Sequence, residues 1–574
     1  MMKNSIKILF AATVAVTALA SCSKFDKMNK NPYAIYDAPS EEFVQPIIFQ
    51  TEKNLMSSFR NTVAFLMQYS ISTNTEQTSK VVSNYNIPEA ADDDIWVGIY
   101  PQFGNAEYMA NLAAKEKNPA MLGVANILKV LTIYQIADTY GNVPFTEAGK
   151  ISLQGGNFSY ITKYDEMKSI YQNIFLLLEQ ANERFNRSDC ENFSALCDYM
   201  YSGDYRKWQR FGNSLYLRLL NRVALKVIEE DGGSLALPDG STISILGKMA
   251  ELYDCFKSGY GNYPVMRGRE DGAVVGFSED NASLQSPFYS TTSGTWNSGG
   301  RACETLAVAM NETSAGEKEG KRQTWTYYTW SNKLKYDPRW DCYFHKTVGA
   351  PTQLKHEDIS DFFDYVISSS GNSLVGSMVQ GQTSSITTGL YPEKGLTFNV
   401  KNPDGRALMN YSELLFIFAE AGIRGWLPIT YPDIRSMYIN AITENILEWR
   451  KDLETDTDGV ISQYTDWRYE EFNVDNALEK IMEQKWISMF FVGIESWCDY
   501  RRTGYPILNT NGPAAENDGI LPTRLRYPAD EAYRNQKYHE EQVNGWLGGK
   551  DNIQTEVWWA DTKESVEMRK KGRQ

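Results

Sequence analysis

An apolar stretch at residues 121–140 constrains the fold of this chain more than any other segment. At about 20 residues it is long enough to cross a bilayer as a helix. Asn118 and Pro119 supply an N-cap and a first-turn proline, and Gly141 follows the last turn. The stretch also contains three polar residues: Lys129, Gln135 and Asp138. A helix that is apolar on most faces but carries such residues is typical of the centre of a soluble helical bundle.

Apolar residues at helical spacing predict further helices on both sides of this one. Residues 164–185 and 204–228 each show the pattern, the second with basic residues on its other faces. Nearer the C-terminus, Asn410 and Glu413 resemble a capping box ahead of an apolar run.

A second helix of this C-terminal pair is predicted to begin at Thr430 and Pro432 and to end at Trp449. The link at residues 424–429 is short, so we expect the two helices to pack antiparallel. Asp475 is predicted to cap another helix. No strict repeat of about 34 residues is visible, so degenerate helical-hairpin repeats stay an open alternative.

The N-terminus has the pattern of a bacterial lipoprotein signal. Two lysines precede an apolar run at residues 8–20, and Leu-Ala-Ser leads directly into Cys22. The run is too short to remain as a membrane-spanning helix. We therefore predict that residues 1–21 are a signal peptide and that the Cys22 thiol receives lipid. The alternative is a plain secretory signal followed by a chance cysteine.

The rest of the chain divides into a tether and a body. Residues 22–40 are polar and contain prolines, as in a tether that leaves a membrane surface. Residues 41–574 are predicted to form the helical body, with long loop excursions near residues 257–405. The chain has 72 acidic and 57 basic residues and a formal net charge of −15, which argues against a nucleic-acid partner.

Motifs for catalysis, metal binding and cofactor binding are missing from the sequence. The three histidines have no metal-ligand spacing, and no CxxC, GxSxG, P-loop or GxGxxG occurs. Asp92–Asp94 could ligate calcium, but a solvated helix start or loop is the favoured interpretation. Cys190 and Cys197 could close a small disulfide loop, although buried free thiols are favoured for the cysteines after Cys22. The 72 acidic residues leave a glycosidase pair open without selecting one.

Aromatic residues in the loop excursions are the best indication of a ligand site. Trp and Tyr faces stack on the apolar side of sugar rings, and each ring contributes on the order of 1.3 kcal/mol by burying apolar area. The alternative for each ring is that it anchors a loop to the core. The ligand-binding candidates are Tyr289, Trp296, Trp325, Tyr327, Tyr328 and Trp330.

Several segments together resemble the SusD/RagB family of nutrient-binding outer-membrane lipoproteins. The resemblance begins with the lipoprotein signal and continues in the same order almost to the C-terminus. The segments that carry it are FDKMNKNP at 25–32, DIWVGIY at 94–100, ADTYGNVPFTEA at 137–148, WQRFGNSLYLRLLNR at 208–222, ELLFIFAEAGIRGW at 413–426, QKW at 484–486, RRTGYP at 501–506, LRYP at 525–528 and the closing residues 551–559.

This resemblance implies a mainly α fold with tetratricopeptide-like helix pairs and a loop-rich ligand-binding face. It also implies a lipid anchor on the outer membrane facing the cell exterior, a glycan ligand, no catalysis and no cofactor. The partner would be a TonB-dependent SusC-like transporter. Some relatives hold peptides, so a peptide ligand is one alternative, and a lipid-anchored glycoside hydrolase and a scaffold that binds only proteins are others. The shared segments are expected to be mainly scaffold, because they lie on predicted helices and their ends.

Overall fold

The computed structural model describes residues 38–72, 94–150, 161–277, 406–508 and 520–571. It also describes shorter pieces, chiefly between residues 300 and 345. The predicted signal peptide and Cys22 lie outside the described residues, as do most residues of the predicted tether. Ala38 is the first residue of the described chain.

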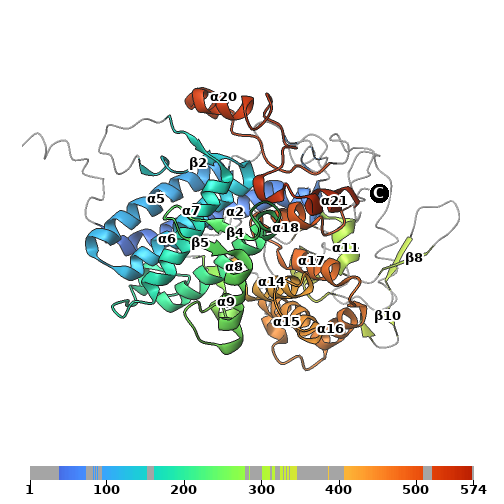
Figure 1. Cartoon of the computed structure of the whole chain (residues 1–574). Coiled ribbons are helices and arrows are strands. Elements are labelled where there is room, and N and C mark those ends of the chain that lie inside the picture. The colour runs from blue at the N-terminus through green and yellow to red at the C-terminus, as the bar shows by residue number, and fades with distance from the viewer. Residues whose placement is uncertain are drawn as a thin grey trace, which may run out of the picture.

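Long helices make up most of the described chain (Figure 1). The N-terminal group is α2 (Val44–Ser58), α5 (Asp94–Glu116), α6 (Pro119–Tyr140), α7 (Met167–Phe185), α8 (Tyr205–Asp231) and α9 (Ile245–Ser258). The C-terminal group is α14 (Tyr411–Ile423), α15 (Tyr431–Trp449), α16 (Val460–Glu471), α17 (Ala477–Ser488) and α18 (Glu495–Thr503). Shorter helices are α3 (Ala64–Leu66), α11 (Glu304–Met310), α12 (Trp340–Tyr343), α19 (Glu531–Arg534), α20 (Gln536–Asn544) and α21 (Lys563–Lys571).

Helix α8 joins the two groups. It packs against α7 and α9 in the first group and against α14 and α18 in the second. Within the groups, sequence neighbours pack in pairs, as α5 does with α6 and α14 with α15. The mainly α architecture with helix pairs that the sequence predicted is therefore confirmed.

Helix α6 lies at the centre of the N-terminal group and is almost completely buried. It has the length and apolar composition of a membrane span, but 89% of its most apolar window is inside the protein. The Asn118 side chain accepts a hydrogen bond from Met121 N at 3.1 Å, and Gly141 ends the helix at a φ of 92°. The predicted bounds and the predicted central position are both correct.

Two predicted helix starts and one predicted capping box were wrong in detail. Helix α7 begins at Met167, because Tyr164 and Asp165 form strand β3 instead. Helix α17 has Asn476 at its N-cap position, so Asp475 is not the cap. Asn410 does cap α14 through Glu413 N at 2.8 Å, but the Glu413 carboxylate pairs with Arg218 rather than closing a capping box.

All strands in the described part of the chain pair into two-stranded antiparallel ladders. The pairs are β1 (Ser70–Ser72) with β7 (Gly300–Ala302), β2 (Val143–Pro144) with β3 (Tyr164–Asp165), β4 (Ser234–Ala236) with β5 (Thr242–Ser244), β6 (Ala273–Val275) with β14 (Arg406–Met409), β8 (Thr313–Gly316) with β9 (Thr324–Tyr327), β10 (Thr329–Trp330) with β11 (Lys333–Leu334), and β12 (Phe344–His345) with β13 (Ser385–Ile386).

The β6–β14 ladder closes the base of the long excursion. Val275 pairs with Arg406, so the two ends of the excursion lie side by side. This ladder lies near the start of the excursion predicted at residues 257–405. Residues 257–258 belong to α9, and Pro264 and Met266 bond to Asn213 and Ser214 of α8.

Candidate functional site

The six candidate ligand-binding residues all fall within the excursion closed by β6 and β14. Trp325 and Tyr327 lie in strand β9, where they pair with Ala315 and Thr313 of strand β8. Trp330 lies in strand β10, opposite Lys333 of strand β11. Tyr289, Trp296 and Tyr328 lie outside the described residues.

A buried arginine anchors the chain just after these aromatic strands. Arg339 is fully buried, and its guanidinium bonds to both carboxylate oxygens of Asp337, at 2.9 and 2.6 Å. It also donates to Asn445 Oδ1 on α15 and to Gln484 Oε1 on α17, each at 2.9 Å. The Tyr464 hydroxyl on α16 donates to Asp337 at 2.6 Å. One buried ion pair thus ties the excursion to three helices of the C-terminal group.

Tyr343 continues this anchor into the aromatic core. Its ring stacks on Phe490 with centroids 4.2 Å apart, and its hydroxyl donates to the carbonyl oxygen of Ile487 at 2.9 Å. Residues 337–343 were not among the predicted functional residues. The signal was the Asp-Pro-Arg-Trp segment at 337–340, which places opposite charges beside aromatic residues.

A second anchor holds the chain before the aromatic strands. Cys303 N bonds to the carbonyl oxygen of Tyr69 at 3.3 Å, and the Thr305 hydroxyl bonds to Gln68 Oε1 at 2.5 Å. Arg468 on α16 donates to the carbonyl oxygen of Ala309. Strands β8 to β11 therefore lie between two attachments to the helical body.

Tyr263 shows that some aromatics near the excursion are structural. Its hydroxyl donates to Glu179 Oε2 at 2.5 Å, and Lys248 Nζ lies 3.8 Å from the ring centroid. Burial and the Glu179 hydrogen bond raise the pKa of Tyr263 to about 12. For Tyr263 the loop-anchor interpretation is therefore correct.

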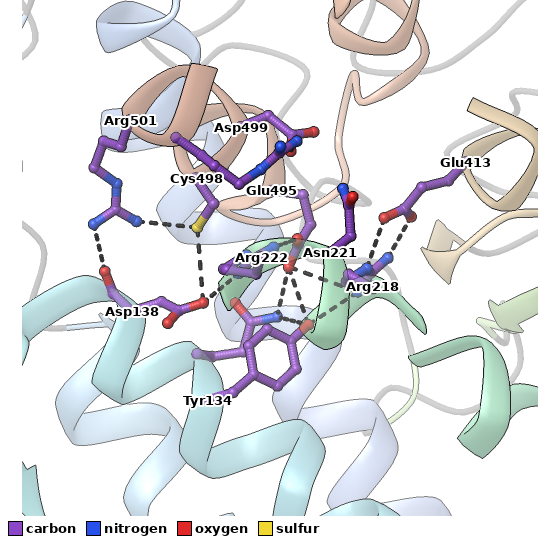
Figure 2. Close-up of polar contacts among 12 residues, drawn as sticks. Tyr134, Asp138, Arg218, Asn221, Arg222, Glu413, Glu495, Cys498, Asp499 and Arg501 are labelled. Atoms are coloured by element: carbon purple, nitrogen blue, oxygen red, sulfur yellow. Dashed lines mark hydrogen bonds and ion pairs between the residues drawn. The ribbon is translucent and has the colours of Figure 1, made fainter. Parts of the chain in front are cut away.

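A network of buried charged residues occupies the junction between the two helix groups (Figure 2). Asp138 on α6 is at one end of it. Its carboxylate pairs with Arg222 on α8 and accepts hydrogen bonds from the Tyr171 hydroxyl at 2.7 Å and from Trp559 Nε1 at 2.8 Å. Its backbone carbonyl accepts from Arg501 on α18 at 2.6 Å. Every oxygen of this buried residue therefore has a partner.

Glu495 on α18 connects Arg222 to a second arginine. It pairs with Arg222, lies 3.6 Å from Arg218 and accepts from the Tyr134 hydroxyl at 3.0 Å. Arg218 in turn binds Glu413 on α14 through two hydrogen bonds, at 2.7 and 2.5 Å. Burial favours the protonated form of Glu495, but Arg218 and Arg222 together hold its pKa below the ordinary value.

Glu420 forms the other end of the network, also on α14. It pairs with Arg502 and Arg424, and Asn221 Nδ2 donates to it at 3.0 Å. Although burial opposes ionisation, Arg502 and Arg424 lower the pKa of Glu420 far below its ordinary value. Asp499 bridges Arg502 and Lys485 at 2.9 and 2.8 Å, and these two cations lower its pKa despite burial.

This network has the properties of a scaffold and not of a reaction centre. A general acid or base needs a carboxyl group that faces substrate and titrates near the working pH. The described carboxylates of the network are instead ion-paired to arginine or lysine inside the protein. Arg501 donates to the backbone carbonyl oxygen of Asp138 and Arg502 pairs with Glu420, so both guanidinium groups are bonded inside the protein.

The described cysteines are free thiols, and all but Cys197 are buried. Burial raises the pKa of Cys190 to about 11 and that of Cys498 to about 12. The possible Cys190–Cys197 disulfide is therefore not formed. Among the described residues, no group of three or more His, Cys, Asp or Glu side chains is placed to hold a metal ion.

The sequence from residue 32 to residue 528 matches a family model described as SusD-like, starch-binding and associating with the outer membrane. The match covers most of the chain. The chain belongs to the SusD-like family. No curated protein sequence matches it.

Solved structures show the same SusD-like fold at low sequence identity. A SusD homologue from Bacteroides fragilis superposes with a TM-score of 0.66 at 18% identity, covering 92% of this chain and 100% of the homologue. A chitin-binding SusD homologue from Flavobacterium johnsoniae gives 0.62 at 19% identity, covering 92% and 99%. A SusD homologue from Bacteroides uniformis gives 0.62 at 20% identity, covering 92% and 100%.

The SusD-like segments noted in the sequence converge on the buried network. Asp138, Arg222, Glu420, Lys485 and Arg502 come from five of those segments and meet at the junction of α6, α8, α14, α17 and α18. The prediction that these segments are mainly scaffold is therefore correct for the network.

Proposed function

We propose that this protein is a non-catalytic, lipid-anchored receptor on the outer membrane. It binds a glycan at the cell exterior and delivers it to a TonB-dependent SusC-like transporter. The match to a family described as starch-binding and outer-membrane-associated carries the proposal. The chitin-binding relative with the same fold and the lipoprotein signal ending at Cys22 support it.

The proposed glycan site is the aromatic part of the excursion. Its members are Tyr289, Trp296, Trp325, Tyr327, Tyr328 and Trp330. Two or three stacked rings, each contributing on the order of 1.3 kcal/mol, together contribute about 2.6–3.9 kcal/mol, which corresponds to millimolar affinity or weaker before hydrogen bonds to the sugar hydroxyls are added. Such affinity allows the ligand to be captured and then released to a transporter. The anchors at Ala309 and Arg339 hold the strands that carry Trp325 and Trp330 close to the helical body.

Binding without cleavage distinguishes this function from a glycoside hydrolase. A hydrolase needs one carboxyl group that donates a proton and a second that acts as base or nucleophile. Glu483 and Glu556 have pKa values raised by burial, but each is ion-paired, to Arg468 and to Arg569 respectively. These pairings argue against Glu483 and Glu556 as the two carboxyl groups of a hydrolase.

A binding screen tests the proposal. The acylated protein is titrated with starch and chitin oligosaccharides and with a peptide library, and ligand concentration is followed over time for cleavage. We expect binding to at least one oligosaccharide, no cleavage, and at least a tenfold loss of affinity in W325A/W330A. Y533A is the matched control, because Tyr533 is an exposed aromatic residue outside the excursion, and it should bind as the unaltered protein does.

Binding of peptides alone would replace the glycan with a peptide ligand. Release of shorter sugars would establish the hydrolase instead. Binding unaffected by W325A/W330A would move the site away from the aromatic strands while leaving glycan capture intact.

A further inference from the structure

Two attachments of the aromatic strands meet on helix α16. Before strands β8 to β11, the carbonyl oxygen of Ala309 in helix α11 accepts a hydrogen bond from Arg468. After these strands, Asp337 accepts a hydrogen bond from the Tyr464 hydroxyl at 2.6 Å. Tyr464 and Arg468 are four positions apart on α16, so they lie on the same face of the helix. Side chains from one turn of α16 therefore hold both Ala309 and Asp337.

A direct hydrogen bond joins the two attachments. Arg468 Nε donates to the Tyr464 hydroxyl oxygen at 3.0 Å, while the same hydroxyl donates to Asp337. An arginine can only donate and an ionised carboxylate can only accept, so the hydroxyl proton points to Asp337 and a lone pair points to Arg468. Burial raises the pKa of Tyr464 above its ordinary value, so the hydroxyl keeps its proton at neutral pH.

The joined groups are enclosed by the protein. The side chains of Tyr464, Arg468, Asp337 and Arg339 are all buried. Arg339 pairs with Asp337, and its Nη2 lies 3.4 Å from the Tyr464 hydroxyl. Inside a protein, hydrogen bonds in a chain strengthen one another, and a buried polar group that loses its partner destabilises the fold. Opening one attachment should therefore weaken the other, because both use the same hydroxyl.

We propose that Tyr464 is a positioning residue for strands β9 and β10, which carry Trp325 and Trp330. Its hydroxyl couples the attachment at Ala309 to the attachment at Asp337, so that the strands between them are held or released at both ends together. The inference rests on the proposed function in that these strands belong to the proposed glycan site. A ligand that contacts both strands binds more tightly when their spacing is fixed in advance.

Hydrogen exchange on the full chain tests the coupling without any ligand. The test variant is Y464F, which removes the hydroxyl and leaves the ion pairs of Asp337 and Arg468 in place. Y438F is the matched control, because Tyr438 is a buried tyrosine on neighbouring α15 whose hydroxyl has no hydrogen-bond partner among the described residues. Mass spectrometry follows amide exchange in α11, in α12, and in α6 as a reference from the other helix group.

We expect exchange in α11 and in α12 to be about tenfold faster in Y464F, the factor expected for the loss of one buried hydrogen bond to a charged group. Exchange in α6 should not change, and Y438F should exchange as the unaltered protein does. Faster exchange in α12 alone would overturn the coupling, because Tyr464 would then serve the Asp337 attachment only. Equally faster exchange in α6 would overturn it as well, because the hydroxyl would then stabilise the whole fold.

A second variant tests the coupling from the other attachment. R468M removes the bond to Ala309 and the bond to Tyr464 together. If the hydroxyl transmits this loss, exchange in α12 should be faster in R468M than in the unaltered protein, and R468M should add little to the effect of Y464F. Additive effects of the two substitutions on exchange in α12 would overturn the coupling.

Glycan affinity separates this inference from the proposed function. For an oligosaccharide that the unaltered protein binds, we expect about three- to tenfold weaker binding in Y464F, the factor for ordering roughly one side chain again, and unchanged binding in Y438F. Unchanged affinity in Y464F, with faster exchange in both α11 and α12, would overturn the positioning role. A protein that binds no oligosaccharide would overturn the proposed function, while the exchange measurements still decide the coupling.

Discussion

Arg222 and Asp138 form an ion pair deep inside the protein, although 84 positions separate them in the chain. Arg222 pairs at the same time with Glu495, which is 273 positions away. One guanidinium thus joins α8 to α6 in its own helix group and to α18 in the other.

Replacing Arg222 with Met should lower the free energy of unfolding by about 3–5 kcal/mol, because two buried carboxylates lose their partner. Chemical denaturation followed by circular dichroism measures this. R187M is the control, since Arg187 pairs with Asp189 on the surface and its loss should leave the unfolding midpoint unchanged. An unfolding midpoint in R222M equal to that of R187M would show that the Arg222 ion pairs contribute little to stability.

Acid should destabilise the protein through three carboxylates of the network. Arginine and lysine partners hold the pKa values of Glu420, Glu495 and Asp499 below those of the unfolded chain, which are about 4.3 for Glu and 3.9 for Asp. The stability that these groups contribute is fully present above those unfolded values and is lost as the pH falls through the lower folded values. Glu483 and Glu556 have raised pKa values and act in the opposite direction.

We therefore expect the contribution of these three carboxylates to the free energy of unfolding to change little between pH 7 and pH 5. Below about pH 4 we expect the free energy of unfolding to fall. Thermal melts across this range measure it. Stability that rises as the pH falls from 7 towards about 4.3 would show that Glu483 and Glu556 dominate there, because their raised pKa values act above the unfolded Glu value.

The anchor at Arg339 gives a prediction about stability and binding together. R339M leaves Asp337 buried without its cation, so we expect a loss of about 3–5 kcal/mol in the free energy of unfolding. Glycan affinity should fall further than in a variant of equal stability outside the excursion, because the strands that carry Trp325 and Trp330 lose one attachment. R222M supplies that comparison. Equal affinity loss in R339M and R222M would show that Arg339 supports the fold only.

Thiol reactivity should separate Cys197 from the other described cysteines. At pH 8 a thiol reagent should modify Cys197 first, and the buried thiols only after unfolding, because burial raises the pKa of Cys190 to about 11 and that of Cys498 to about 12. Mass spectrometry of digested protein identifies the modified site. Early modification of Cys498 would indicate that the junction of the helix groups opens in the native state.

Substituting Gly141 tests whether the end of the central helix α6 requires glycine. Its φ of 92° strains any other residue, and an added Cβ would lie 2.0 Å from the Trp546 ring. G141A should cost about 1–3 kcal/mol in the free energy of unfolding. G232A is the control, because Gly232 also has a positive φ of 63° but has open space where the Cβ would lie. A smaller loss of unfolding free energy in G141A than in G232A would mean that the Trp546 side chain moves aside at little cost.

Local signals in the sequence were enough to place several helices. Asn118 and Gly141 bound α6 correctly, and Thr430 starts α15, because capping depends on residues within one turn. Glu413 was assigned to a capping box, a local motif, and it instead bonds to Arg218, 195 positions away. Tertiary contact decided its orientation, and no spacing rule contains that information.

The candidate site was less predictable for the same reason. Aromatic composition indicated the excursion, but the pairing of Val275 with Arg406 and the bonds from Arg339 to α15 and α17 join distant segments. The Asn410 cap could be predicted because its partner, Glu413, is only three positions away in the sequence. Contacts across more than a hundred positions depend on how the helices pack, and residue types alone do not set that packing.

The β6–β14 ladder has an evolutionary consequence. Because the excursion starts and stops at neighbouring backbone positions, its length and composition can change while the helices beneath keep their register. The excursion can therefore change in evolution as a separate unit, provided that residues such as Arg339 continue to bond it to the helical body.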